Sequence, residues 1–74
     1  LSPEEIRKSA VNSFFLQCPL LEGLSASNKL ILTDRFFSNH SNVVQIDEEG
    51  KIVETQDFKN TFDAFLKEYT EPAE

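Results

Sequence analysis

The sequence predicts a small α+β domain, mainly helical, with the element order helix, helix, β-hairpin, helix. Three segments repeat apolar residues at helical spacing, and a stretch rich in valine and isoleucine surrounds an acidic, glycine-containing turn between the second and third. A chain of 74 residues has room for one hydrophobic core, so residues 1–74 form a single small domain. Because it starts at Leu1 and contains no methionine, we expect it to be an excised or processed part of a longer protein.

The first helix is predicted over residues 3–17. Ser2 offers an N-cap hydroxyl, Pro3 suits the first helical position, and Glu5 stands three residues after the cap. An apolar stripe follows at four-residue spacing, formed by Ile6, Ala10, Phe14 and Cys18. Pro19 has no backbone N–H and must end the helix.

A second helix begins after Ser25, which can cap it, and runs toward the polar cluster at residues 38–42. Its large apolar residues point in nearly every direction at 100° per residue, so one flat contact cannot cover them all. These residues are Leu30, Ile31, Leu32, Phe36 and Phe37. The helix is therefore either central in the core or involved in binding.

Residues 43–46 and 51–54 have the composition of strands and flank the turn at 47–50. Gly50 is well placed for the left-handed position of a short hairpin loop, which predicts a β-hairpin. Thr55 can then cap a third, strongly amphipathic helix, limited by Pro72. Its apolar face comprises Phe58, Phe62, Phe65, Leu66 and Tyr69.

The net charge of −6 lies entirely in the C-terminal part of the chain. Residues 1–46 carry four acids and four bases, whereas residues 47–74 carry nine acids and three lysines. An acidic field repels phosphate backbones, and the seven basic residues are spread over every predicted element. We therefore expect no nucleic-acid partner, although the element order resembles a winged helix and leaves such a binder as the least favoured alternative. No apolar run approaches the roughly 18 residues that a membrane span requires, so no membrane partner is expected.

Catalytic, metal and cofactor chemistry have little basis in the sequence. Cys18, the only cysteine, belongs to an apolar stripe, and His40, the only histidine, lies in a polar cluster. A calcium loop with Gly50 at its sixth position would place Gln56 where the metal needs a carboxylate. We expect no enzyme activity, no cofactor and no metal. A single cysteine also excludes an intramolecular disulfide, which favours an intracellular, cytoplasmic location.

The acidic residues 47–49, followed by residues 55–57 and a closing amphipathic helix, resemble the last third of acyl carrier proteins. This resemblance covers roughly 25 residues and implies an acidic carrier or regulatory domain. In that family a serine of an Asp-Ser-Leu triplet carries phosphopantetheine. The corresponding region here contains Ser25 and Ser27 but lacks the triplet.

The favoured function is a non-catalytic docking or assembly module that uses an apolar patch on the second helix. The first and third helices cannot cover every apolar residue of that helix, and what remains would form a binding patch. Ile31 and Phe37 are the expected anchors, with Leu30 and Arg35 beside them. The partner would be another protein, another part of a parent chain, or a second copy. The alternative is that all five apolar residues are core.

Overall fold

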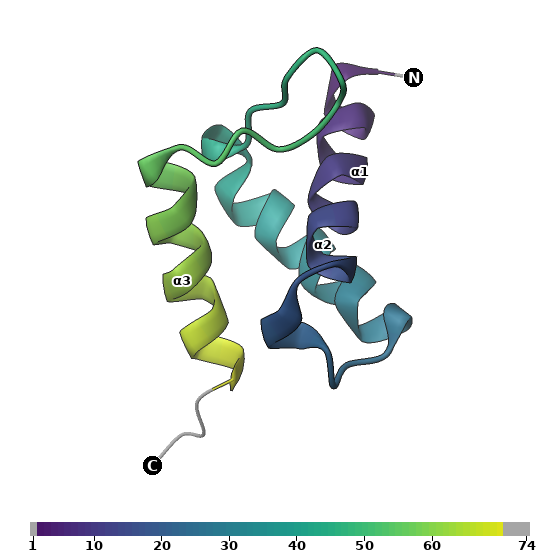
Figure 1. Ribbon diagram of the computed structural model, residues 1–74, viewed down its shortest axis with the longest axis vertical. Coiled ribbons are helices and arrows are strands. Elements are labelled where there is room, and N and C mark those ends of the chain that lie inside the picture. Colours follow the sequence, from purple (N-terminus) through teal and green to yellow (C-terminus); the bar gives the residue numbers. More distant parts are fainter. Residues whose placement is uncertain (1, 71–74) are drawn as a thin grey trace.

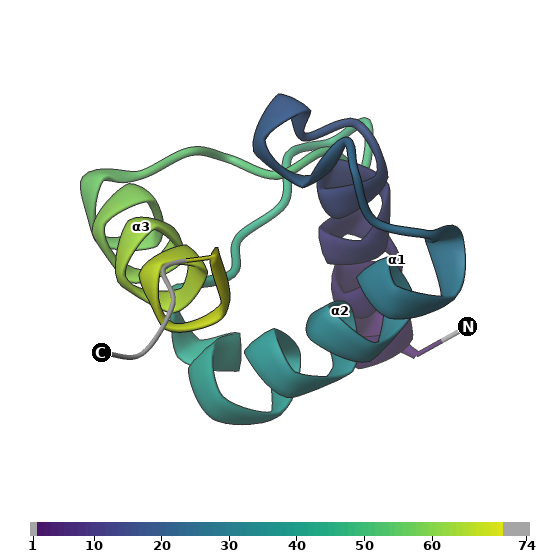
Figure 2. The same cartoon turned by 90° about the horizontal axis from the view of Figure 1, so that it is seen from below.

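The computed structural model describes residues 2–70, apart from the side chains of residues 69 and 70, and consists of three α-helices (Figure 1). They are α1 (Pro3–Leu16), α2 (Ala26–His40) and α3 (Gln56–Thr70). Two 3-10 helices, η1 (Pro19–Leu21) and η2 (Ser41–Val43), lie in the connections. Seen from below, α1 and α3 stand apart and α2 passes along one side of both (Figure 2).

The three helices begin where the sequence predicts, because each start has a hydroxyl N-cap. Ser2 Oγ accepts a hydrogen bond from the backbone N–H of Glu5 at 3.2 Å, and Ser25 Oγ accepts one from Asn28 at 3.2 Å. Thr55 Oγ1 does the same for Phe58 at 3.1 Å. Each cap satisfies a backbone donor that has no partner within its helix, which fixes the first turn locally.

Phenylalanine rings fill the space between the helices. Phe36 of α2 is central: its ring centroid lies 5.7 Å from that of Phe15 on α1, and 5.8 and 5.2 Å from those of Phe58 and Phe65 on α3. Most of these ring pairs meet edge to face, the arrangement that the quadrupole of an aromatic ring favours. The buried aliphatic residues around the rings are Val11, Leu21, Leu32, Val44 and Leu66.

The predicted α+β fold with a β-hairpin is wrong: within residues 2–70 there is no β-strand. Residues 46 and 52 form a single antiparallel bridge, and residues 41–43 are the 3-10 helix η2. Adjacent residues of a strand point to opposite faces, so a strand could turn only one of Val43 and Val44 toward the core. Here the η2 turn lets both valines pack against the core, which leaves too little extended chain for a ribbon.

The acidic turn itself forms as expected. Gly50 has a φ of 79°, the left-handed region that side chains with a Cβ disfavour. The carboxylate of Asp47 accepts hydrogen bonds from the backbone N–H groups of Glu49 at 2.8 Å and Lys51 at 3.0 Å. Asp47 therefore organises the turn from its own side chain, as Asx turns do.

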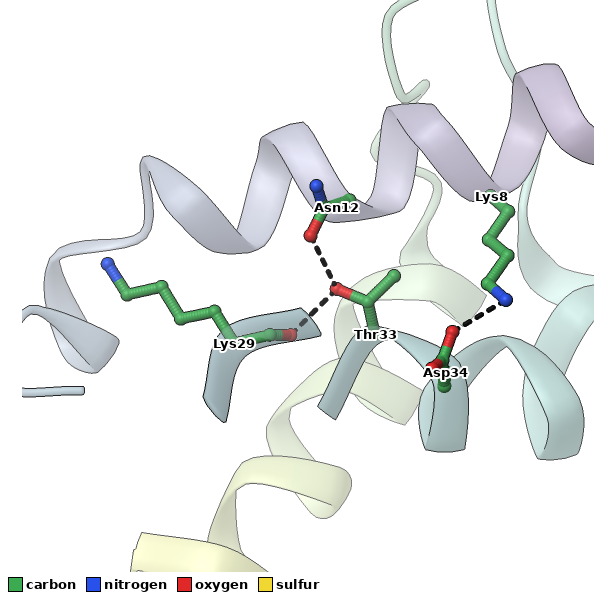
Figure 3. Close-up of polar contacts among 5 residues, drawn as sticks. All are labelled: Lys8, Asn12, Lys29, Thr33 and Asp34. Carbon is green, nitrogen blue, oxygen red and sulfur yellow. Dashed lines mark hydrogen bonds and ion pairs between the residues drawn. The ribbon is translucent and has the colours of Figure 1, made fainter. Parts of the chain in front are cut away.

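The α1–α2 contact contains a polar layer (Figure 3). Thr33 is the buried polar residue among those described; its hydroxyl donates to the carbonyl oxygen of Lys29 at 2.9 Å and lies 3.3 Å from Oδ1 of Asn12 on α1. Nearby, Lys8 of α1 forms an ion pair with Asp34 of α2. The hydroxyl has its partner within its own helix, so its burial leaves no hydrogen bond unmade, and the Lys8–Asp34 ion pair joins the two helices.

Candidate docking surface

Leu30 and Ile31, two of the expected binding residues, lie at the surface. Their exposed fractions are 49% and 51%, whereas Leu32 and Phe36 of the same helix are buried. Leu32 and Phe36 are four residues apart on the side of α2 that faces the core. At 100° per residue Ile31 lies about 100° from Leu32 and about 140° from Phe36, so it points away from that side. One side of α2 therefore packs in the core, while Leu30 and Ile31 leave apolar side chains at the surface.

Phe37 and Arg35, the other two expected residues, are placed differently. Phe37 is half-buried and packs against the core, with the guanidinium carbon of Arg7 5.5 Å from its ring centroid. Arg7 is itself held by a 3.3 Å hydrogen bond from Nη1 to the carbonyl oxygen of Val44. A cation over an aromatic face stabilises the ring where it lies, so Phe37 is partly covered within the chain. Arg35 is exposed.

Three further apolar residues at the surface were missed by the sequence argument. Leu16 ends α1, Leu20 lies in η1 with an exposed fraction of 71%, and Leu24 precedes the cap of α2. Five of the seven exposed large apolar residues described therefore fall within residues 16–31, a segment we call the apolar stretch. The pattern that could have indicated it is the run of leucines between Pro19 and Ser25, where connecting loops are ordinarily polar.

One buried leucine holds this connection in place. Leu21 is 1% exposed and belongs to the core cluster, whereas its neighbour Leu20 projects beside α3. Leu20, together with Asp63, Leu66 and Lys67 of α3, lines a shallow hollow of about 230 Å³. The η1 turn therefore presents a leucine and an adjacent hollow on a fixed backbone.

Cys18 and His40, the cysteine and the histidine of this chain, both pack against apolar residues. Cys18 is half-buried against the core. The imidazole of His40 packs against the rings of Phe36, at 5.3 Å between centroids, and Phe65, at 6.4 Å. Within the described part of the chain, no three His, Cys, Asp or Glu residues gather closely enough to hold a metal ion.

Asp47 is the described carboxylate with a clearly altered proton affinity. The backbone N–H of Lys51 lowers the pKa of this carboxyl below its ordinary value of 3.8, and the N–H of Glu49 and the ammonium group of Lys51 act in the same direction. These interactions favour the charged form, while partial removal from water opposes it. The lowered pKa thus reflects a structural role in the turn.

Comparison with known proteins gives no match to a protein-family model, to a curated protein or to a solved structure. None of the helices within residues 2–70 combines the length and the apolar character needed to cross a membrane.

Proposed function

We propose that this domain is a non-catalytic docking module that binds another protein through its apolar stretch. The observation that carries the proposal is the concentration of exposed apolar side chains in residues 16–31, while the other residues whose exposure is described contribute only Ile6 and Val53. Single exposed apolar residues are ordinary on a protein surface, whereas a contiguous apolar patch is typical of interaction sites, and the proposal requires these five side chains to act as one surface.

The free energy available from burying these exposed side chains fits a modest, reversible interaction. Fully burying a leucine or isoleucine is worth about 1.5–3 kcal/mol, so covering the exposed half of Leu30 and of Ile31 contributes about 1 kcal/mol each. Leu16, Leu20 and Leu24 bring the apolar stretch to roughly 5 kcal/mol before the costs of association. Polar contacts at the rim must supply the rest of any tight affinity.

The proposal places the module inside the cell, as a docking or assembly part of a larger complex. Cys18 is a free thiol, and a protein with a lone thiol needs no oxidising compartment to fold. Ser25, one of the two serines that a carrier function would modify, accepts the N-cap hydrogen bond of α2.

The test uses charged substitutions at exposed apolar positions. Leu20→Asp and Ile31→Asp each place a charge in the apolar stretch, and Val53→Asp is the matched control, since Val53 is 38% exposed but lies outside it. Proteins captured from the native host with each variant are compared by quantitative mass spectrometry. We expect the first two variants to lose a partner that wild type and control both retain.

Circular dichroism must show that all three variants keep the wild-type helical content, so that lost capture reflects the surface and not the fold. Equal capture by all four proteins would contradict docking through the apolar stretch. Intact mass of the chain from its host supplies the second criterion: a phosphopantetheine adduct on Ser25 or Ser27 would favour a carrier function instead.

A further inference from the structure

We draw no further inference here: the strongest candidate, the groove of about 440 Å³ between α1 and residues 50–54, has one base, Lys51, and one acid, Glu54, in its lining, and nothing in the structure shows what covers it.

Discussion

Replacing Phe36 by alanine should remove a large part of the stability of this domain. Phe36 is fully buried and its ring contacts the rings of Phe15, Phe58 and Phe65, so it joins all three helices. Truncating a buried phenylalanine costs about 3–5 kcal/mol, which includes the cavity left behind. We expect about 4 kcal/mol or slightly more here, because each lost edge-to-face pair adds to the loss of buried area.

This loss is a large share of the total free energy of unfolding because the chain is short. At roughly 0.05–0.15 kcal/mol per residue, a domain of 74 residues has a free energy of unfolding of about 4–11 kcal/mol. For domains of this size each kcal/mol shifts the melting temperature by about 4–8 °C, so Phe36→Ala should lower it by about 15–30 °C. Phe36→Leu keeps most of the volume and should cost about 1–1.5 kcal/mol, which gives a measurable variant if alanine prevents folding.

The assay is thermal unfolding followed by circular dichroism at 222 nm, where this helical chain gives a strong change. Leu30→Ala is the matched control: it shortens an apolar side chain on the same helix, but one that is half exposed, and should cost about 1 kcal/mol or less. A melting temperature for Phe36→Ala within a few degrees of that control would refute the reasoning, since it would mean that the ring cluster does not hold the helices together.

Three further predictions concern polar and backbone features. Thr33→Val keeps the shape of the side chain but removes the hydroxyl that bonds the Lys29 carbonyl, and should lower the free energy of unfolding in urea by about 1 kcal/mol. Gly50→Ala should lower the free energy of unfolding by about 1–2 kcal/mol in the same assay. Because φ is 79° and no atom lies within 4 Å of the added Cβ, the penalty comes from the backbone conformation and not from a clash. An unchanged urea midpoint would contradict the left-handed turn. The pKa of Asp47 is lowered in the folded chain, so its stabilisation of the turn is complete above the unfolded value of 3.8 and is lost as the pH falls through the folded value. Amide exchange of Lys51 should thus stay slow at neutral pH and accelerate only below about pH 4, corrected for intrinsic rates; loss of protection already near pH 6 would show another group in control.

The positions of the helices could be read from the sequence because their determinants are local. Ser2, Ser25 and Thr55 bond a backbone N–H three residues away, and Pro19 cannot continue a helix whatever surrounds it. The end of the second helix was less clear. It continues to His40 through residues that favour a turn, and the imidazole packs against the ring of Phe65 on α3, a contact between helices that are distant in the sequence.

The exposure of the candidate binding residues also depends in part on the tertiary structure. The expectation that α2 has more apolar surface than it can bury rested on helical periodicity, and Leu30 and Ile31 are indeed exposed. Whether Phe37 is covered depends on Arg7, 30 positions earlier, whose guanidinium lies over the ring. The exposure of Leu20 depends on η1, which turns Leu21 into the core and leaves its neighbour outside.

By itself, the sequence determined where the three helices begin, the apolar face of the third helix, the left-handed turn at Gly50, and the separation of charge between the two parts of the chain. Only the tertiary structure decided that residues 43–54 form one bridge and no hairpin, because the η2 turn packs both Val43 and Val44 against the core and a two-stranded ribbon is only marginally stable by itself. It also decided which apolar residues stay exposed. Capping and turn geometry act over three or four residues, whereas burial depends on neighbours that are distant in the chain.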